Sequence, residues 1–280
     1  MFSASKLVIG MVVALVAASY ASAAKQKYSP HPLTVCADPA NLPFSNDAEQ
    51  GFENQLAKLV AHDLHRPLAF AWAPQRGEFL KKTLNAGKCD LVMGLPSSTD
   101  DAQPTIPYYR SSFVFVSRRD HPIDVRSFED AALHNARIGV QIMQHEAAVA
   151  PPAQVLISHG LADNISWFRL FPDFSRPNPT WALIEAVEKG EIDAAVSWGP
   201  IAGYFAKHAA VPLLVTPVPH SPDADSLSFD ISMAARSGDA TLVSELNAVI
   251  AKRRARIHAI LDDYGVPQSS LAAHLTTAGR

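Results

Sequence analysis

Residues 33–54 read LTVCADPANLPFSNDAEQGFEN, and they form the most informative part of the chain. It opens with an apolar run of strand length, Leu33–Ala37, which is followed by a polar loop with two prolines. Gly51 then precedes a helical pattern. A strand that ends in a polar loop and leads into a helix is the unit from which an open α/β sheet builds a ligand crevice. We therefore predict an α/β fold with a binding site at this loop.

The alternation of strand and helix continues to residue 95. Apolar residues at helical spacing predict a helix from residue 52 to 64, and residues 69–73 read as a strand. A second helix is predicted over 79–86, with Gly87 as its end signal. The continuous apolar run 91–95 is typical of a strand buried on both faces of a parallel sheet. Strands that alternate with helices predict parallel pairing with right-handed crossovers.

A second lobe is predicted beyond Pro96. Residues 112–117 form an extended apolar run that we interpret as a first crossing, and 227–234 are extended again as a return crossing. Two lobes joined in this way around a cleft define the type II periplasmic binding protein fold. The expected boundaries are 24–115 for lobe 1, 116–226 for lobe 2 and 227–280 for the return crossing and C-terminal helices that complete lobe 1. Within these bounds we predict strands at 137–141, 192–198 and 213–218, helices around 181–187 and over 199–208, and a helix over 239–264 that is interrupted near Ala251.

The first residues predict export. Lys6 precedes the apolar run 7–18, and Ala21-Ser22-Ala23 offers small residues for cleavage. The run is too short to span a bilayer, so we predict a signal peptide over 1–23 rather than a membrane anchor. The mature chain would begin near Ala24 and lie in the periplasm.

Composition and motifs exclude several functions. The chain is 48% hydrophobic and 18% charged, a composition typical of a globular protein. Its formal net charge of −3 lacks the excess of basic residues that nucleic-acid binding requires. Ala195–Gly199 approximates the elbow of serine hydrolases, but its first glycine is missing. The 11 histidines are scattered without metal spacing, and no glycine-rich phosphate loop occurs. We predict no catalytic residue, no metal and no cofactor.

The two cysteines, Cys36 and Cys89, predict a disulfide, because the chain is exported and the two predicted strands that carry them are usually neighbours. The alternative is a pair of free buried thiols.

An ordered set of short motifs resembles the MoxJ/XoxJ family, the solute-binding-like proteins associated with quinoprotein (methanol-type) dehydrogenases. The resemblance covers nearly the whole mature chain and is densest from residue 33 to 120. Gly77 departs from it, since a second basic residue is expected after Arg76. The motifs are those at 37–46, 51–54, 74–76, 83–90, 93–96, 107–111 and 198–204.

The resemblance implies a periplasmic accessory protein of a dehydrogenase that depends on pyrroloquinoline quinone (PQQ). It leaves open whether such proteins bind a small molecule or the dehydrogenase itself. Amino-acid receptors of this fold carry Thr-x-x-Arg after the third strand to clamp the ligand carboxylate. Residues 98–101, Ser-Thr-Asp-Asp, contain no arginine, and the aspartate that would hold the ammonium is absent around Trp198. A free amino acid is therefore an unexpected ligand.

The predicted cleft is aromatic and weakly polar, which suits a segment of another protein or a larger, partly apolar ligand. Its aromatic members also fit a second interpretation, in which they close the lobe cores, and Arg76 and Arg110 could be surface ion-pair partners. The candidate residues are Asp38, Asn41, Phe44, Trp72, Gln75, Arg76, Tyr108, Tyr109, Arg110 and Trp198.

The run Lys252-Arg253-Arg254-Ala255-Arg256 is a local basic cluster on a predicted helix. It fits either a solvated helix face or a docking patch for an acidic partner.

Overall fold

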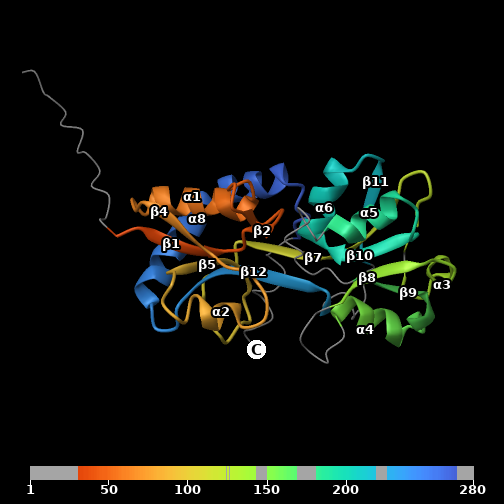
Figure 1. Ribbon diagram of the computed structural model, residues 1–280, viewed down its shortest axis with the longest axis horizontal. Coiled ribbons are helices and arrows are strands. Elements are labelled where there is room, and N and C mark those ends of the chain that lie inside the picture. The colour runs from red at the N-terminus through yellow and green to blue at the C-terminus, as the bar shows by residue number, and fades with distance from the viewer. Residues whose placement is uncertain are drawn as a thin grey trace, which may run out of the picture.

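The computed structural model describes residues 31–123, 125, 127–142, 150–168, 181–218 and 226–269 (Figure 1). The predicted signal peptide lies outside the described residues. Two groups of strands and helices lie at opposite ends of the long axis, and the strands β7 and β12 connect them. This is the predicted type II periplasmic binding protein fold, with two α/β lobes joined by two crossing segments.

The first lobe contains the predicted parallel strands. β1 (Leu33–Ala37) lies between β4 (Leu68–Trp72) and β5 (Leu91–Pro96), in the register Leu33↔Leu68 and Val35↔Leu91. The crossover helices are α1 (Phe52–Asp63) and α2 (Phe79–Lys82). β2 (Ala40–Asn41) and β3 (Ser45–Asn46) form a small separate hairpin after β1.

The second helix is shorter than predicted. α2 ends at Lys82, whereas the sequence pattern extends to residue 86. The hydroxyl of Thr83 donates to the carbonyl of Phe79, and the chain then turns to Gly87, which has a φ of 74°. A side chain that bonds its own backbone competes with helix formation, which accounts for the early end.

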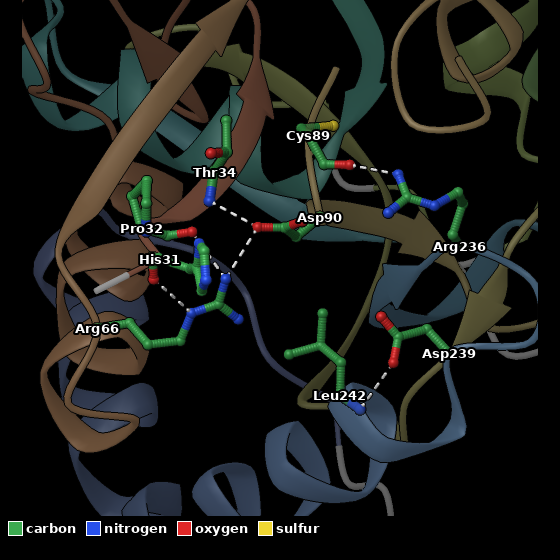
Figure 2. Close-up of polar contacts among 9 residues, drawn as sticks. All are labelled: His31, Pro32, Thr34, Arg66, Cys89, Asp90, Arg236, Asp239 and Leu242. Carbon is green, nitrogen blue, oxygen red and sulfur yellow. Dashed lines mark hydrogen bonds and ion pairs between the residues drawn. The ribbon is translucent and has the colours of Figure 1, made fainter. Parts of the chain in front are cut away.

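The starts of the strands in lobe 1 are held by a polar network (Figure 2). Asp90, just before β5, accepts from the backbone N–H of Thr34 at 3.0 Å and from Arg66 at 3.1 Å. Arg66 also donates to the carbonyls of His31 and Pro32, and Arg236 donates to the carbonyl of Cys89 at 2.9 Å. These bonds fix the strand order at the edge opposite to the binding loop.

The predicted disulfide is present. Cys36 in β1 and Cys89 before β5 are bonded, with their Cα atoms 5.5 Å apart. Both sulfurs are buried in the small core on the face of the sheet that α2 covers. The alternative of two free thiols is therefore wrong.

The two crossings are adjacent antiparallel strands. β7 (Tyr109–Arg118) pairs with β12 (Ser228–Ala235), with Tyr109 opposite Ile231. β12 also pairs with β5 and with the short β6 (Gln103–Pro104), while the far half of β7 pairs with strands of lobe 2. The two lobes therefore share one ten-stranded sheet among the described residues.

The second lobe is built from parallel strands with antiparallel partners. Its central strand β10 (Ala194–Trp198) pairs with β8 (Ile138–Gln141) and β7, and β8 pairs with β9 (Ile165–Phe168). The helix Pro151–Ser158 and strand β9 were not predicted, whereas the strands expected over 137–141 and 213–218 and the helix expected over 199–208 are present. The remaining elements are α3 (Ala131–His134), α4 (Pro151–Ser158), a 3-10 turn (Ala162–Asn164), α5 (Ala182–Glu188), α6 (Gly199–His208) and β11 (Leu213–Pro217).

The last helix, α8 (Ala240–Asp263), returns to lobe 1 and packs on α1. Asp239 caps its first turn by accepting from the backbone N–H of Leu242 at 3.1 Å. The predicted interruption near Ala251 is wrong, because buried residues continue through that turn from Val249 and Ile250 to Ile257. None of the helices in the described part of the chain has the length and apolarity needed to span a membrane.

Candidate functional site

The candidate site of lobe 1 lies where parallel strands β1, β4 and β5 end. Their carboxyl ends meet at one edge of the sheet, where open α/β sheets bind ligands. The loop after β1 and the first turn of α1 reach the same edge, because the backbone N–H groups of Phe52 and Glu53 donate to the carbonyls of Pro43 and Phe44. Gly51 is required there, since a β-carbon on it would stand 2.0 Å from the Phe44 carbonyl oxygen.

Asp38 connects the loops that follow two strands. Its carboxylate accepts from the backbone N–H of Ala40 at 2.8 Å and from that of Gln75 at 2.6 Å. The residue is 4% exposed, and its own carbonyl accepts from the hydroxyl of Ser45. The structure therefore brings Asp38 and Gln75 together, as predicted for one site, and Asp38 shapes the loops through two backbone bonds.

Glu53 is a site residue that the sequence reasoning missed. It lies in the first turn of α1, is 7% exposed and has no hydrogen-bond partner for its carboxyl group among the described residues. The carboxyl lies against Gly94 of β5. Burial, and then the nearby charge of Asp38, raise the pKa of Glu53 to about 8. Glu53 is therefore a neutral acid at pH 7, able to donate one proton or to ionise beside a cation.

A pattern in the sequence does point to this burial. Glu53 precedes Ala57 and Val60 by four and seven residues, and both are fully buried. That spacing places Glu53 on the inward face of the helix.

The two predicted cleft tyrosines lie in the core of lobe 1 beneath Glu53. Tyr108 and Tyr109 are 2% and 1% exposed, and the hydroxyl of Tyr108 donates to the carbonyl of Met93 at 3.1 Å. Burial is the main cause that raises the pKa of both phenols, and the charge of Glu53 adds to it. The two tyrosine rings pack edge-on against each other, and Tyr109 also packs edge-on against Phe52.

The hairpin loop supplies two further predicted residues. Asn41 lies in β2 and its carbonyl accepts from the backbone N–H of Phe44. The ring of Phe44 is half-buried, 5.3 Å from that of Phe52, and contacts the cores of both lobes. Phe44 thus lies between the lobes. It packs against the cores and also faces the junction of the two lobes, so both interpretations describe part of its position.

Trp72 is the exposed aromatic of the site. It ends β4 opposite Ala37, is 37% exposed and stacks on Phe70 with ring centroids 4.8 Å apart. The next loop carries Gln75, half-buried, and Arg76, exposed. A tryptophan whose ring is held by a neighbour but faces solvent is a typical contact surface for a partner.

Arg110 and Trp198 lie at the crossing strands rather than beside Glu53. Arg110 pairs across the sheet with Asp230 at 3.1 Å, and its side chain is 12% exposed. The indole of Trp198 packs between the rings of Phe113 and Phe229, with centroids 5.4 and 5.8 Å away. Both residues therefore contribute to the hinge between the lobes.

The edge of lobe 1 thus combines two acids with no clamping arginine. Residues 97–101 after β5 form a turn whose Ser97 hydroxyl bonds to the strand β12, at the carbonyl of Asp230 and the hydroxyl of Ser232. Among the described residues, no three His, Cys, Asp or Glu side chains are grouped so that they could hold a metal ion. The arrangement suits hydrogen-bond donors and cations rather than a free carboxylate.

Two residues of the basic cluster on α8 form ion pairs within the chain. Arg253 forms a two-pronged ion pair with Asp63 of α1, with both N–O distances 2.7 Å, and Lys252 lies 3.3 Å from the same carboxylate. These contacts hold the pKa of Asp63 well below its usual range, with the Arg253 hydrogen bonds as the largest cause. Two of the four basic residues therefore join helices rather than face a partner.

The chain belongs to the bacterial extracellular solute-binding proteins, family 3, whose model matches residues 33–266. Within this class, the crystal structure of the periplasmic binding protein XoxJ from Methylobacterium extorquens AM1 is 33% identical, covers 85% of this chain and 99% of its own, and has a TM-score of 0.71. The crystal structure of MxaJ from Methlophaga aminisulfidivorans MPT is 27% identical, covers 85% and 100%, and also has a TM-score of 0.71.

A curated relative gives the same result. Protein MoxJ of Methylorubrum extorquens is 26% identical over 249 residues, which is 84% of this chain and 81% of the relative. The predicted resemblance to the MoxJ/XoxJ family is confirmed. An ancestral amino acid-binding protein, at 21% identity and a TM-score of 0.58, shares the fold.

Proposed function

We propose that this chain is a periplasmic accessory protein of a PQQ-dependent, methanol-type dehydrogenase, without catalytic activity of its own. It binds the dehydrogenase, or a segment of it, and aids its maturation or activation. The similarity to XoxJ, MxaJ and MoxJ supports the assignment of this chain to a methanol-type dehydrogenase system. The observation that carries the binding mode is the edge of lobe 1, where Asp38 and Glu53 are buried acids and residues 97–101 contain no arginine.

The acidic edge favours a protein segment over a free amino acid. A free amino acid brings a carboxylate, which would meet Asp38 and a buried Glu53 instead of a guanidinium. A segment inside a polypeptide has no carboxylate on its backbone and offers N–H groups and basic side chains. Residues 97–101, where the clamp would lie, contain no arginine or lysine, and the exposed Arg76 lies on a different loop, after β4.

We infer that a lysine or arginine of the partner binds at the carboxyl group of Glu53. Insertion of a cation would favour ionisation of the glutamate. A buried pair of this kind is net favourable only where further hydrogen bonds offset the cost of removing both charges from water. Trp72, exposed beside the same strand ends, would cover the aliphatic part of that side chain. Binding would then release a proton near neutral pH.

The second candidate is a receptor that hands a small molecule to an importer. The family supports this function, and the same acidic edge would accept an organic cation. A receptor of this kind gains thermal stability when its ligand is added, because the ligand binds the folded chain. A protein-binding module does not respond to a library of small cations.

The deciding experiment is capture with the purified mature chain as bait. The bait is incubated with periplasm from methanol-grown cells, and mass spectrometry identifies both the proteins and the small molecules retained. We expect the dehydrogenase at a near-stoichiometric ratio, and we expect the variant Glu53→Gln to retain less of it. A stoichiometric metabolite without dehydrogenase would overturn the proposal in favour of the receptor.

The captured dehydrogenase then allows a second measurement. Titration of purified dehydrogenase with the chain, in two buffers of different ionisation enthalpy, reports proton release on binding. We expect wild-type chain to release protons near pH 7 and Glu53→Gln to release fewer. Asp47→Asn is the matched control, since Asp47 is an exposed acid in the same loop.

A further inference from the structure

The two lobes touch outside the crossing strands, where α6 of lobe 2 meets the end of α8 of lobe 1 (Figure 1). A β-carbon on Gly203 would stand only 1.8 Å from the carbonyl oxygen of Gly265. In the other direction, a β-carbon on Gly265 would stand 3.0 Å from the carbonyl oxygen of Gly203. The two backbones are therefore in direct contact, and neither position has room for a side chain.

A lysine strengthens the contact. Lys207 of α6 donates from Nζ to the carbonyl of Asp263, the last residue of α8, at 2.9 Å. Carbonyls in the last turn of a helix have no partner within the helix, and the dipole favours a cation there. Lobe 2 thus caps a helix of lobe 1.

Further contacts lie on either side of the approach of Gly203 to Gly265: a pair of stacked rings and a hydrogen bond to the hinge strand β7. The rings of Tyr204 and Tyr264 stack with centroids 5.9 Å apart and an interplanar angle of 19°, and the hydroxyl of Tyr264 donates to the carbonyl of Gln50. Beyond Gly265, the carbonyl of Pro267 accepts from the hydroxyl of Ser111 in β7 at 2.7 Å. The segment after α8 is therefore fixed to lobe 1 and to the hinge.

We define the α6–α8 seam as Gly203, Tyr204 and Lys207 with Asp263, Tyr264, Gly265 and Pro267. We propose that this seam fixes the angle between the lobes, so that the chain presents a preformed surface and does not close around a ligand by hinge bending. Two crossing strands alone would allow rotation, since loop or strand-end residues absorb the dihedral changes of a hinge. Rotation about these strands would have to move α6 relative to Gly265, against the direct backbone contact between Gly203 and Gly265.

The inference about the seam goes beyond the proposed function, and it is tested on the chain without a partner. Spin labels are placed on exposed residues of each lobe with Lys81→Cys in α2 and Ala132→Cys in α3, and the distance distribution is measured by pulsed electron resonance. We expect one narrow distance in the otherwise wild-type chain. Broad or double distributions would overturn the proposal, whether or not a dehydrogenase is captured in the other experiment.

Gly203→Ala tests the contact itself. The added methyl must move from 1.8 to at least 3.0 Å from the Gly265 oxygen, so α6 and α8 must separate. We expect the label distance to shift or broaden. Gly190→Ala is the control: it strains a glycine of lobe 2 with a φ of 70°, but the added β-carbon would have no neighbour within 4 Å, so the distance should stay unchanged.

Two milder variants keep the test available if Gly203→Ala fails to fold. Lys207→Met removes the cap and Tyr204→Leu removes the ring stack, and neither adds a backbone clash. Together they should broaden the distribution, whereas Lys88→Met, a charge change on the surface of lobe 1, should not. An unchanged distribution in the double variant would overturn the proposal.

Discussion

The carboxyl group of Glu53 lies on the backbone of Gly94, and a β-carbon at position 94 would stand 2.1 Å from its Oε1 atom. Helix α1 and strand β5 are thus fitted to each other where the buried acid Glu53 lies against the sheet. The contact explains why β5 carries a glycine between Met93 and Leu95, which are both buried. It also makes the position of the acid testable.

Gly94→Ala should cost about 1–3 kcal/mol of stability, because the added methyl displaces a buried carboxyl. The same change in a Glu53→Ala background should cost less than about 1 kcal/mol, since the clash is gone. Urea unfolding of the four proteins in this cycle gives the coupling energy. If the two substitutions are additive, Glu53 does not lie where the structure places it.

The raised pKa of Glu53 predicts a pH dependence. The folded chain holds the proton up to about pH 8, while the unfolded chain loses it near 4.5. The folded state therefore binds more protons in this window, and stability should fall as the pH rises through it, by up to about 1.4 kcal/mol per pH unit. Urea unfolding at pH 5.5 and 7.5 measures the slope. In Glu53→Gln this contribution is absent, so an equal slope in both proteins would contradict the assignment.

The ion pair between Asp63 and Arg253 should behave in the opposite way. The pKa of Asp63 is lowered in the folded chain, so its contribution is present above about pH 4 and is lost as the pH falls below it. Asp63→Asn should destabilise the chain by about 1–3 kcal/mol at pH 7, because Arg253 loses a two-pronged partner. Thermal unfolding checks this. Glu191→Gln, an exposed acid in lobe 2, should have no comparable effect.

The disulfide should contribute strongly to lobe 1. It links residues 53 positions apart, and closing a loop of that length is worth roughly 4 kcal/mol on the chain-entropy model. The paired variant Cys36→Ala and Cys89→Ala should lower the free energy of unfolding by that order. If stability is lost in lobe 1 alone, hydrogen exchange should become faster in β1 and β5 than in β8 and β10. Uniform exchange in both lobes would argue against a local effect.

The fold could be predicted because the parallel strands of lobe 1 carry their own signals. Apolar runs 33–37 and 91–95 are long enough to read alone, and the shared loop 38–51 lies between a strand and a helix whatever the rest of the chain does. The length of α2 could not be predicted, because it depends on the bond from Thr83 to Phe79 rather than on periodicity. The uninterrupted α8 depends on packing against α1, which lies almost 200 residues earlier in the chain.

Part of the geometry of the candidate site follows from the same local signals. Asp38 and Gln75 meet because the carboxyl ends of β1 and β4 are neighbours, which parallel pairing implies. The role of Trp198 could not be read from its strand, since Phe113 and Phe229 reach it from two other strands. The contact between Gly203 and Gly265 joins two glycines in different lobes, and each glycine alone looks like an ordinary small residue.

Two tryptophans allow the binding surface to be located. Trp72 and Trp181 are 37% and 39% exposed and stack on Phe70 and Phe205, so substitution by alanine removes similar surface from each. Trp72 lies at the strand ends beside Asp38, whereas Trp181 lies at the start of α5 and its indole N–H donates to Glu188. A partner that binds at the acidic edge of lobe 1 contacts the first and not the second. Trp72→Ala should therefore weaken dehydrogenase binding by about tenfold or more, as for an aromatic hot spot, while Trp181→Ala should leave it within about twofold. Calorimetric titration of both variants measures the difference, and equal losses would place the binding surface elsewhere.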